Sequence, residues 1–227
     1  MKRAPTKKIL IGLTSHADLD GVRKTGYYLS EAAHPWQVFN QAGYTVDLAS
    51  TAGGEPPVDG ADLSDPIQRA FTEDPEVRVK LASTPTFADV NSADYDAVLF
   101  AGGHGTMWDF PSDPALARVA REIYESGGVV AAVCHGPAAL VGVKLSDGRA
   151  LVEGKEVSAF TNAEEAAAGL TDVVPFLLQD RLEQLGAKHT GAPNFEPHVM
   201  VDNRLVTGQN PASATGVAQA VLAELSG

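Results

Sequence analysis

Three short runs of purely apolar residues constrain the fold of this chain more than any other feature. They cover residues 9–13, 97–101 and 129–133. None of them alternates with polar residues, as a strand with one solvated face would, so each is expected to be buried on both faces. Segments with helical periodicity separate them, which is typical of a mostly parallel sheet covered by helices on both sides. The sequence therefore predicts an α/β fold built as a three-layer sandwich.

The same patterns predict where the main elements lie. We expect four strands and four helices, the strands at 9–13, 46–49, 97–101 and 129–133 and the helices at about 29–42, 114–126, 174–185 and 212–225. Residues 53–94 interrupt this alternation and are rich in Pro, Gly and Asp. This segment is expected to be an insertion at the sheet edge that contains short helices at 66–71 and 76–82.

Pairs of turn residues predict two hairpins in the second half of the chain. Asp-Gly at 147–148 and Glu-Gly at 153–154 indicate one hairpin over 145–160, and Asp-Asn at 202–203 indicates another over 199–207. No repeat or linker separates two cores. Residues 1–227 are therefore expected to form a single domain with a flavodoxin-like sandwich.

Composition limits the partners and the compartment. The chain has 17 basic and 29 acidic residues and a net charge of −12, so neither nucleic acid nor an anionic membrane surface is an expected partner. A single cysteine forms no internal disulfide, which suits a reducing cytosol. Residues 1–8 are basic, but the apolar run that follows is too short for a signal peptide, and no run reaches the length of a membrane span. We expect a cytoplasmic protein.

The strand at 129–133 runs directly into Cys134, His135, Gly136 and Pro137. Glycine permits a tight bend and proline suits the first turn of a helix, so this pattern predicts a nucleophile elbow. An elbow places the cysteine at the carboxyl end of the strand, beneath a helix amino terminus that favours the thiolate. A lone cysteine is otherwise more often a small buried hydrophobic residue. We expect Cys134 to be a nucleophile and His135 a general base or acid.

A second buried strand, at 97–101, ends in the glycine-rich loop Gly102, Gly103, His104 and Gly105. Glycines allow a backbone to approach a ligand closely, and their N–H groups can stabilise an oxyanion. The spacing does not match the dinucleotide fingerprint, which needs G-x-G-x-x-G opening a helix. We expect Gly102, Gly103 and His104, together with Gly136 of the elbow, to bind substrate.

These motifs occur with others in an order that resembles the DJ/PfpI superfamily. The further motifs are the residues at 25–31 (TGYYLSE), 34–36 (HPW), 160–165 (FTNAEE) and 204–213 (RLVTGQNPAS). Within the superfamily they are similar to the branch that contains the heat-shock glyoxalase III and chaperone proteins. The resemblance covers nearly the whole chain and implies the fold of class I glutamine amidotransferases. Those enzymes carry a late His-Pro-Glu, whereas residues 196–198 read Glu-Pro-His, which argues against amidotransferase activity.

The resemblance implies a site of cysteine, histidine and acid. Cys134 matches the family nucleophile, His135 its partner, and Glu31 the buried acid that hydrogen-bonds the sulfur. The third member of the triad falls within 162–165, and we place it at Glu165, with Glu164 as the alternative. Without the resemblance, Glu31 would be interpreted as a solvated helix residue and the two adjacent glutamates as a charged turn.

The function implied is a cofactor-independent glyoxalase III that converts methylglyoxal, a small 2-oxoaldehyde, into lactate. Cys134 would add to the aldehyde, and His135 or Glu31 would move a proton between the two carbons. Neither a metal nor glutathione is required. The alternatives are a stress chaperone, which needs an exposed apolar patch, and a cysteine-dependent deglycase, amidase or peptidase. The family also suggests a homodimer.

Overall fold

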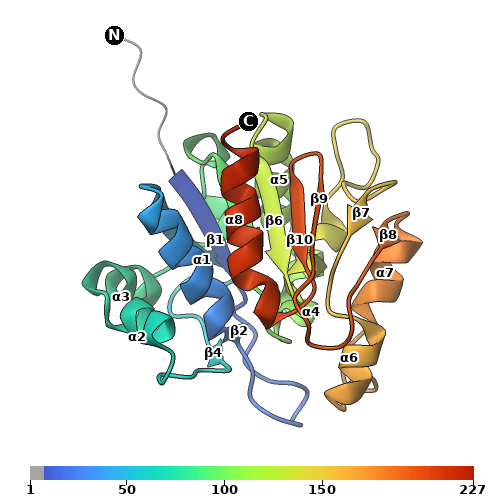
Figure 1. The fold of residues 1–227 in the computed structure, drawn as a ribbon, viewed down its shortest axis with the longest axis horizontal. Coiled ribbons are helices and arrows are strands. Elements are labelled where there is room, and N and C mark those ends of the chain that lie inside the picture. Colours follow the sequence, from blue (N-terminus) through green and yellow to red (C-terminus); the bar gives the residue numbers. More distant parts are fainter. Residues whose placement is uncertain (1–7) are drawn as a thin grey trace.

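The computed structural model describes residues 8–227; the basic start that we considered as part of a targeting segment lies outside the described residues, apart from Lys8. A six-stranded sheet with the order β3-β1-β5-β6-β10-β9 forms the centre of the molecule (Figure 1). Five strands run parallel, namely β1 (Lys8–Leu13), β3 (Thr45–Ser50), β5 (Ala97–Phe100), β6 (Val129–Val133) and β10 (Leu205–Gly208). The edge strand β9 (Val199–Asp202) runs antiparallel to β10.

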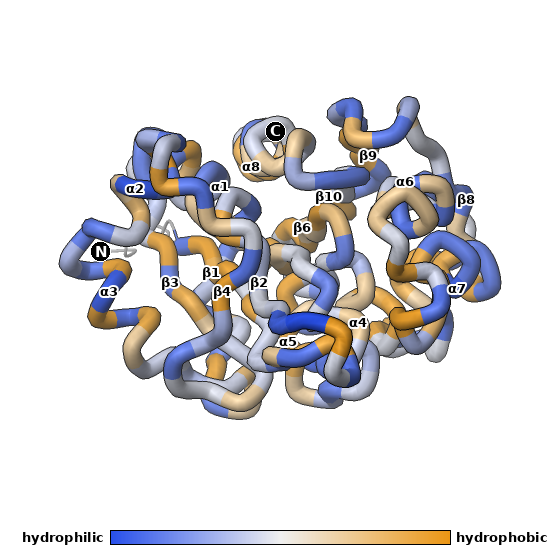
Figure 2. Tube along the Cα trace, turned by 90° about the horizontal axis from the view of Figure 1, so that it is seen from below, coloured by the Kyte–Doolittle hydropathy of each residue, from blue (hydrophilic) through white to orange (hydrophobic). Residues whose placement is uncertain are grey.

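Helices cover both faces of this sheet. In Figure 1, α1 (Leu29–Gln41) and α8 (Ala214–Glu224) lie in front of the strands and α5 (Pro114–Glu125) lies behind them. Alternate residues of β1 face opposite layers: Ile9 and Ile11 pack in the core under α1 and α8, whereas Leu10 packs in the core under α5. Figure 2 shows the strands as the hydrophobic interior between these layers. The predicted three-layer α/β sandwich is confirmed.

The predicted insertion at 53–94 contains short elements, none of which joins the central sheet. They are β4 (Val58–Asp59), α2 (Pro66–Glu73), α3 (Pro75–Ala82) and the 3-10 helices η1 (Phe87–Asp89) and η2 (Ser92–Asp94). Asp65 caps α2 and Asp74 caps α3, each followed by a proline in the first turn, so both short helices begin where local sequence favours a start. Strand β4 pairs with β2 (Tyr27–Tyr28) beside α1.

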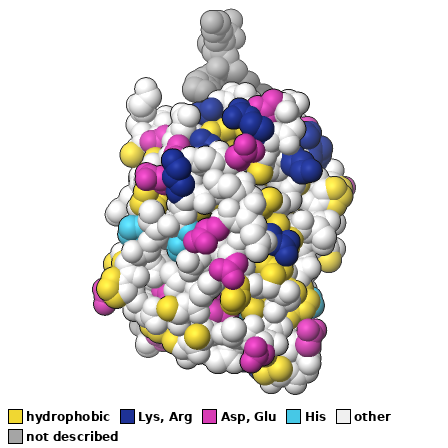
Figure 3. Space-filling model, turned by 90° about the vertical axis from the view of Figure 1, so that its right-hand side faces the viewer, with side chains coloured by type: hydrophobic (Ala, Val, Ile, Leu, Met, Phe, Trp, Pro, Cys, Tyr) yellow, Lys and Arg dark blue, Asp and Glu magenta, His cyan; other side chains and the backbone are white. Residues whose placement is uncertain are grey.

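The remaining elements follow the strands of the second half. They are α4 (Thr106–Asp109), η3 (Phe110–Ser112), η4 (Gly136–Gly142), β7 (Glu156–Val157), α6 (Asn162–Ala167), α7 (Leu178–Gln184), β8 (Lys188–His189) and η5 (Pro211–Ser213). Charges of both signs are mixed on the face at the α6–α7 side, with Lys and Arg mostly in its upper part (Figure 3). None of the helices in the described part of the chain has the length and apolar character needed to cross a bilayer.

The hairpin predicted over 145–160 is wrong, whereas the one over 199–207 is confirmed as β9 and β10. Only an isolated bridge between Lys144 and Ala150 forms around the first turn, and β7 instead pairs in parallel with β8. Leu151 and Val152 are buried in the core, so the chain turns inward where a hairpin strand would continue. Helix α7 begins at Leu178, four residues later than predicted. Pro175 disfavours helical backbone at the residue before it, which accounts for the absence of a helix start at residue 174.

Candidate active site

Cys134 directly follows β6 and forms a sharp, strained turn. Its backbone φ is 62°, in the left-handed region that residues other than glycine rarely adopt. Two hydrogen bonds hold the turn: the Cys134 N–H donates to Gly208 O and the Phe160 N–H donates to Cys134 O, each at 2.9 Å. A Cβ on Gly136 would lie 2.2 Å from Phe100 O, so a side chain there would clash with β5. Cys134 therefore adopts the geometry expected of a nucleophile elbow.

Three side chains form a chain of contacts at this elbow. His135 Nδ1 lies 3.4 Å from the Cys134 sulfur, and His135 Nε2 lies 2.7 Å from Glu165 Oε2. The exposed fractions of Cys134, His135 and Glu165 are 4%, 1% and 3%. The predicted nucleophile, its imidazole partner and the preferred acid are thus brought together in the order that a catalytic triad requires.

The protonation states in this triad follow from burial and hydrogen bonding. Two histidine partners lower the pKa of Glu165 to about 2, so its carboxylate is ionised and accepts hydrogen bonds only. Burial, with the neighbouring His104, lowers the pKa of His135 to about 4, so its ring is neutral at pH 7. Its Nε2 must therefore carry the proton that it donates to Glu165. His135 Nδ1 is left as the unprotonated base that faces the sulfur.

Glu31, on the first turn of α1, is the second acid at the sulfur. It is fully buried, and its Oε2 accepts a hydrogen bond from the Gly102 N–H at 2.6 Å. Its Oε1 is buried without a hydrogen-bond partner of good geometry, and Cys134 lies close enough that each group shifts the pKa of the other. Burial raises the pKa of Glu31 to about 8, so the carboxyl is protonated and uncharged at pH 7.

The expectation that the elbow lowers the pKa of the sulfur is wrong. Burial raises the pKa of the Cys134 thiol well above its usual value. The helix that follows the elbow is the 3-10 helix η4, seven residues long, rather than an α-helix. Cys134 is therefore a thiol at rest, and its activation depends on the base at His135 Nδ1 rather than on a helix dipole.

We expect Glu31→Gln to stabilise the protein at neutral pH. The unfolded chain releases the Glu31 proton near pH 4.5 and the folded chain only near pH 8. The free energy of unfolding therefore falls as the pH rises between these values. At pH 7 the raised pKa of Glu31 lowers the free energy of unfolding by about 3 kcal/mol. A glutamine is neutral at every pH and does not carry this cost. Urea unfolding at pH 4 and pH 7 measures the effect. Equal stability of the two proteins at pH 7 would contradict the assigned protonation state.

A cavity of about 190 Å³ gives access to the sulfur. The cavity is lined by residues of the site and by apolar and aromatic side chains. The lining residues are Arg23, Tyr28, Gly103, His104, Cys134, His135, Phe160, Phe195 and Pro211. Of the residues predicted to bind substrate, Gly103 and His104 lie at the cavity. Gly102 and Gly136 do not line it, and the Gly102 N–H is already donated to Glu31, so it is not free to bind an oxyanion. The Gly103 N–H has no acceptor within residues 8–227.

Sequence reasoning missed the aromatic walls of the cavity. Phe195 is 52% exposed and has a φ of 64°, although a bulky residue rarely adopts this backbone conformation. Its N–H donates to Glu164 Oε1 at 2.8 Å, and its ring lies 6.3 Å from that of Phe160. Glu164, the alternative triad acid, thus hydrogen-bonds the loop that carries Phe195, whereas His135 is hydrogen-bonded to Glu165. No local motif around Phe195 signals this role.

His104, His135 and Glu165 also form a group that could hold a metal ion, with ligand atoms within 4.8 Å of one another. Nε2 of each histidine already donates to the Glu165 carboxylate, that of His104 at 2.8 Å and that of His135 at 2.7 Å. A metal held by these two nitrogens and the carboxylate would have to displace both protons and break the triad contact. Hydrogen bonding therefore accounts for the arrangement of the two Nε2 atoms around the carboxylate.

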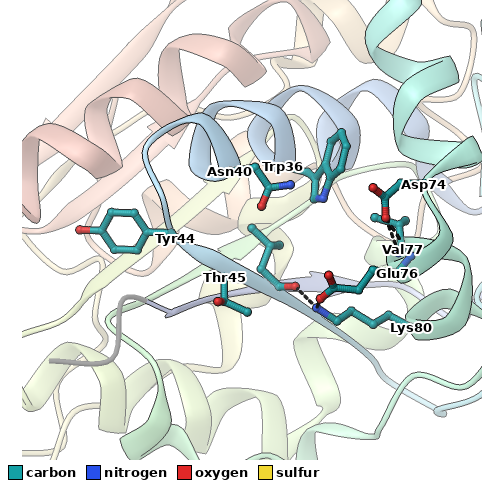
Figure 4. A pocket seen from close by; sticks show the side chains of 9 residues that line it. Trp36, Asn40, Tyr44, Thr45, Asp74, Glu76, Val77 and Lys80 are labelled. Atoms are coloured by element: carbon teal, nitrogen blue, oxygen red, sulfur yellow. Dashed lines mark hydrogen bonds and ion pairs between the residues drawn. The ribbon is translucent and has the colours of Figure 1, made fainter. Parts of the chain in front are cut away.

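Another cavity, of about 140 Å³, lies between α1, β3 and α3 (Figure 4). The Lys80 ammonium at this cavity is already paired, because it contacts Glu76 at 2.6 Å and also donates to Val46 O. No cysteine or histidine lines it. Of the two, only the cavity at Cys134 combines a nucleophile with a base.

Comparisons with known proteins place this geometry in context. A model of the DJ-1/PfpI family matches residues 22–224. The chain is 36% identical to the glutathione-independent glyoxalase HSP31 of Saccharomyces cerevisiae, over 93% of this chain and 95% of that protein. The crystal structure of the Rapid Encystment Protein 24 kDa of Francisella tularensis superposes with a TM-score of 0.93 at 40% identity, covering 96% and 99% of the two chains. The crystal structure of glyoxalase III of Candida albicans superposes with a TM-score of 0.90 at 32% identity, covering 97% of this chain and 98% of that chain.

Proposed function

This chain belongs to the DJ-1/PfpI family, and from that premise we propose that it is a glutathione-independent glyoxalase. It converts a 2-oxoaldehyde such as methylglyoxal into the 2-hydroxy acid, here lactate. The observation that supports this most is the Cys134 thiol facing the free nitrogen of His135 at a small cavity, with Glu165 fixing the ring. Relatives that match nearly the full chain carry the same activity in their names.

The first step is addition of the sulfur to the aldehyde carbon. His135 Nδ1 takes the thiol proton as the C–S bond forms and then gives it to the carbonyl oxygen, which becomes the hydroxyl of a hemithioacetal. The imidazolium formed in this step is stabilised by the adjacent Glu165 carboxylate. The unpaired Gly103 N–H at the cavity is suited to the developing alkoxide.

The rest of the reaction is an internal oxidation and reduction. The aldehyde carbon loses a proton and becomes the acyl carbon of a thioester, while the neighbouring ketone carbon gains a proton and becomes the alcohol carbon. Water then hydrolyses the thioester and returns the Cys134 thiol. Oxidation of one carbon balances reduction of the other, and the protein's own sulfur takes the place of glutathione, so the steps need no added reductant.

The test is a substrate comparison with the purified protein and no added glutathione. We expect lactate from methylglyoxal, and no cleavage of a small amide or a peptide. Cleavage of either without lactate formation would overturn the proposal in favour of a hydrolase. Suppression of client-protein aggregation that persists in Cys134→Ala, without lactate from the wild type, would instead support the chaperone alternative.

We also propose that the protein acts in the cytoplasm as a homodimer on small carbonyl compounds. The single cysteine supports a reducing compartment. Light scattering of the purified protein tests the dimer, because a mass of one chain at all concentrations would contradict it. Fractionation of the source cells tests the compartment.

A further inference from the structure

The reaction proposed above leaves one step without an assigned group. After the sulfur has added, a base must take the proton from the first carbon and return it to the second. This base has to line the cavity and have a free lone pair. His135 Nδ1 faces the sulfur, and Glu31 is protonated, bound to the Gly102 N–H and does not line the cavity. Neither of the groups first considered for this step is well placed.

His104 meets both requirements. It lies at the wall of the cavity that also contains Cys134, and its ring centroid is 4.0 Å from that of His135. Its Nε2 lies 2.8 Å from Glu165 Oε1, while His135 Nε2 contacts the other oxygen of the same carboxylate. One carboxylate therefore orients two imidazole rings side by side.

The shared carboxylate also fixes the tautomer of His104. Because ionised Glu165 only accepts hydrogen bonds, His104 Nε2 must carry the proton between them. In the neutral ring the lone pair is then on Nδ1. Within residues 8–227 this Nδ1 has no hydrogen-bond partner, and it is not among the buried polar atoms that lack one, so it is an accessible atom of a ring that lines the cavity. The site thus holds two bases, one facing the sulfur and one facing the substrate.

We propose that His104 is a catalytic residue that carries the proton between the two substrate carbons, an inference that rests on the proposed glyoxalase function. His104 Nδ1 takes the proton from the carbon bound to sulfur. The electron pair of that C–H bond forms the carbon–carbon double bond of an enediolate, and the ketone C=O pair moves onto its oxygen. The proton of the hydroxyl on the first carbon passes to this oxygen, a C=O bond forms at the first carbon, and the double-bond pair takes the proton from His104 at the second carbon. The thioester results with no net gain or loss of protons by the ring.

The test variant is His104→Gln, whose amide N–H can still donate to Glu165 but which has no basic lone pair. We expect kcat for lactate to fall by about 100-fold with little change in KM, as for loss of one general base. The rate at which iodoacetamide alkylates Cys134 should stay unchanged, because His135 and Glu165 are intact. His104→Asn provides a second variant if the first does not fold. His198→Gln, a histidine outside the cavity, is the matched control and should keep full activity.

An isotope measurement separates proton transfer from positioning. With methylglyoxal deuterated at the aldehyde carbon, the isotope effect on kcat should be larger in His104→Gln than in the wild type, because proton abstraction then limits the rate. If His104→Gln formed lactate at the wild-type rate, the inference would be overturned while the glyoxalase proposal stayed intact. A parallel fall in Cys134 alkylation would also overturn it, because His104 would then act only through Glu165. Absence of lactate from the wild type would instead reject the glyoxalase proposal.

Discussion

Cys134→Ala is expected to abolish lactate formation from methylglyoxal, with a fall in kcat of about 10⁵-fold or more, as when a covalent nucleophile is removed. The reason is that the proposed route begins with a C–S bond to the aldehyde, and no other described residue at the cavity offers a thiol. Lactate released from methylglyoxal without glutathione measures the effect. Turnover near the wild-type rate in the variant would reject the covalent mechanism.

The control for this prediction is that the Cys134→Ala variant remains folded. Alanine is smaller than cysteine and keeps the same strained backbone, so the variant should lose no more than about 1 kcal/mol of stability. Thermal unfolding followed by circular dichroism checks this. Cys134→Ser should also be inactive while retaining a similar volume, because a hydroxyl is a much weaker nucleophile than a thiol beside a neutral imidazole.

Glu165→Gln is expected to lower kcat by about 10³–10⁴-fold, similar to the effect of the corresponding change in other triads. A glutamine has only one accepting oxygen, whereas Glu165 accepts N–H groups from both His104 and His135. One ring must then rotate or change tautomer, so a nitrogen lone pair no longer faces the sulfur or the substrate. Steady-state kinetics with methylglyoxal, at matched fractions of folded protein, measure the loss.

Glu164→Gln is the matched variant one residue away. Oε1 of Glu164 accepts from the Phe195 N–H, from Gln209 and from Asn210, and Oε2 accepts from Thr161. The change therefore leaves buried donors unsatisfied and should lower the free energy of unfolding by about 1–3 kcal/mol while the triad contacts remain. If the folded Glu164→Gln protein were inactive and Glu165→Gln retained full turnover, the assignment of the triad acid would be wrong.

The layers of the fold could be predicted because local and long-range requirements agree. The apolar runs at 97–101 and 129–133 have no polar residue to place in solvent, so only a sheet covered on both sides satisfies them. The prediction of a hairpin at 145–160 was wrong because turn dipeptides indicate local bends and do not determine which distant strand pairs with β7. That partner, β8, is set by the packing of α7 in the core.

The choice between Glu164 and Glu165 could have been made from sequence. Thr161 and Glu164 form a capping box, in which the glutamate three residues after the cap folds back to the backbone N–H of the cap. That use of Glu164 leaves Glu165 to reach His135. The protonation of Cys134 and Glu31 could not be predicted in this way, because it depends on how completely distant segments bury both groups.

The hydrogen bond between Glu31 and the Gly102 amide joins residues 71 positions apart, and the one between His104 and Glu165 joins residues 61 apart. Contacts of such sequence separation form late in folding, because the entropy of closing the intervening loops is lost before the contacts form. The helices, whose hydrogen bonds are local, can therefore form before the catalytic groups meet. Recovery of turnover after dilution from denaturant would then lag behind recovery of helical circular dichroism, and would report completion of the native topology.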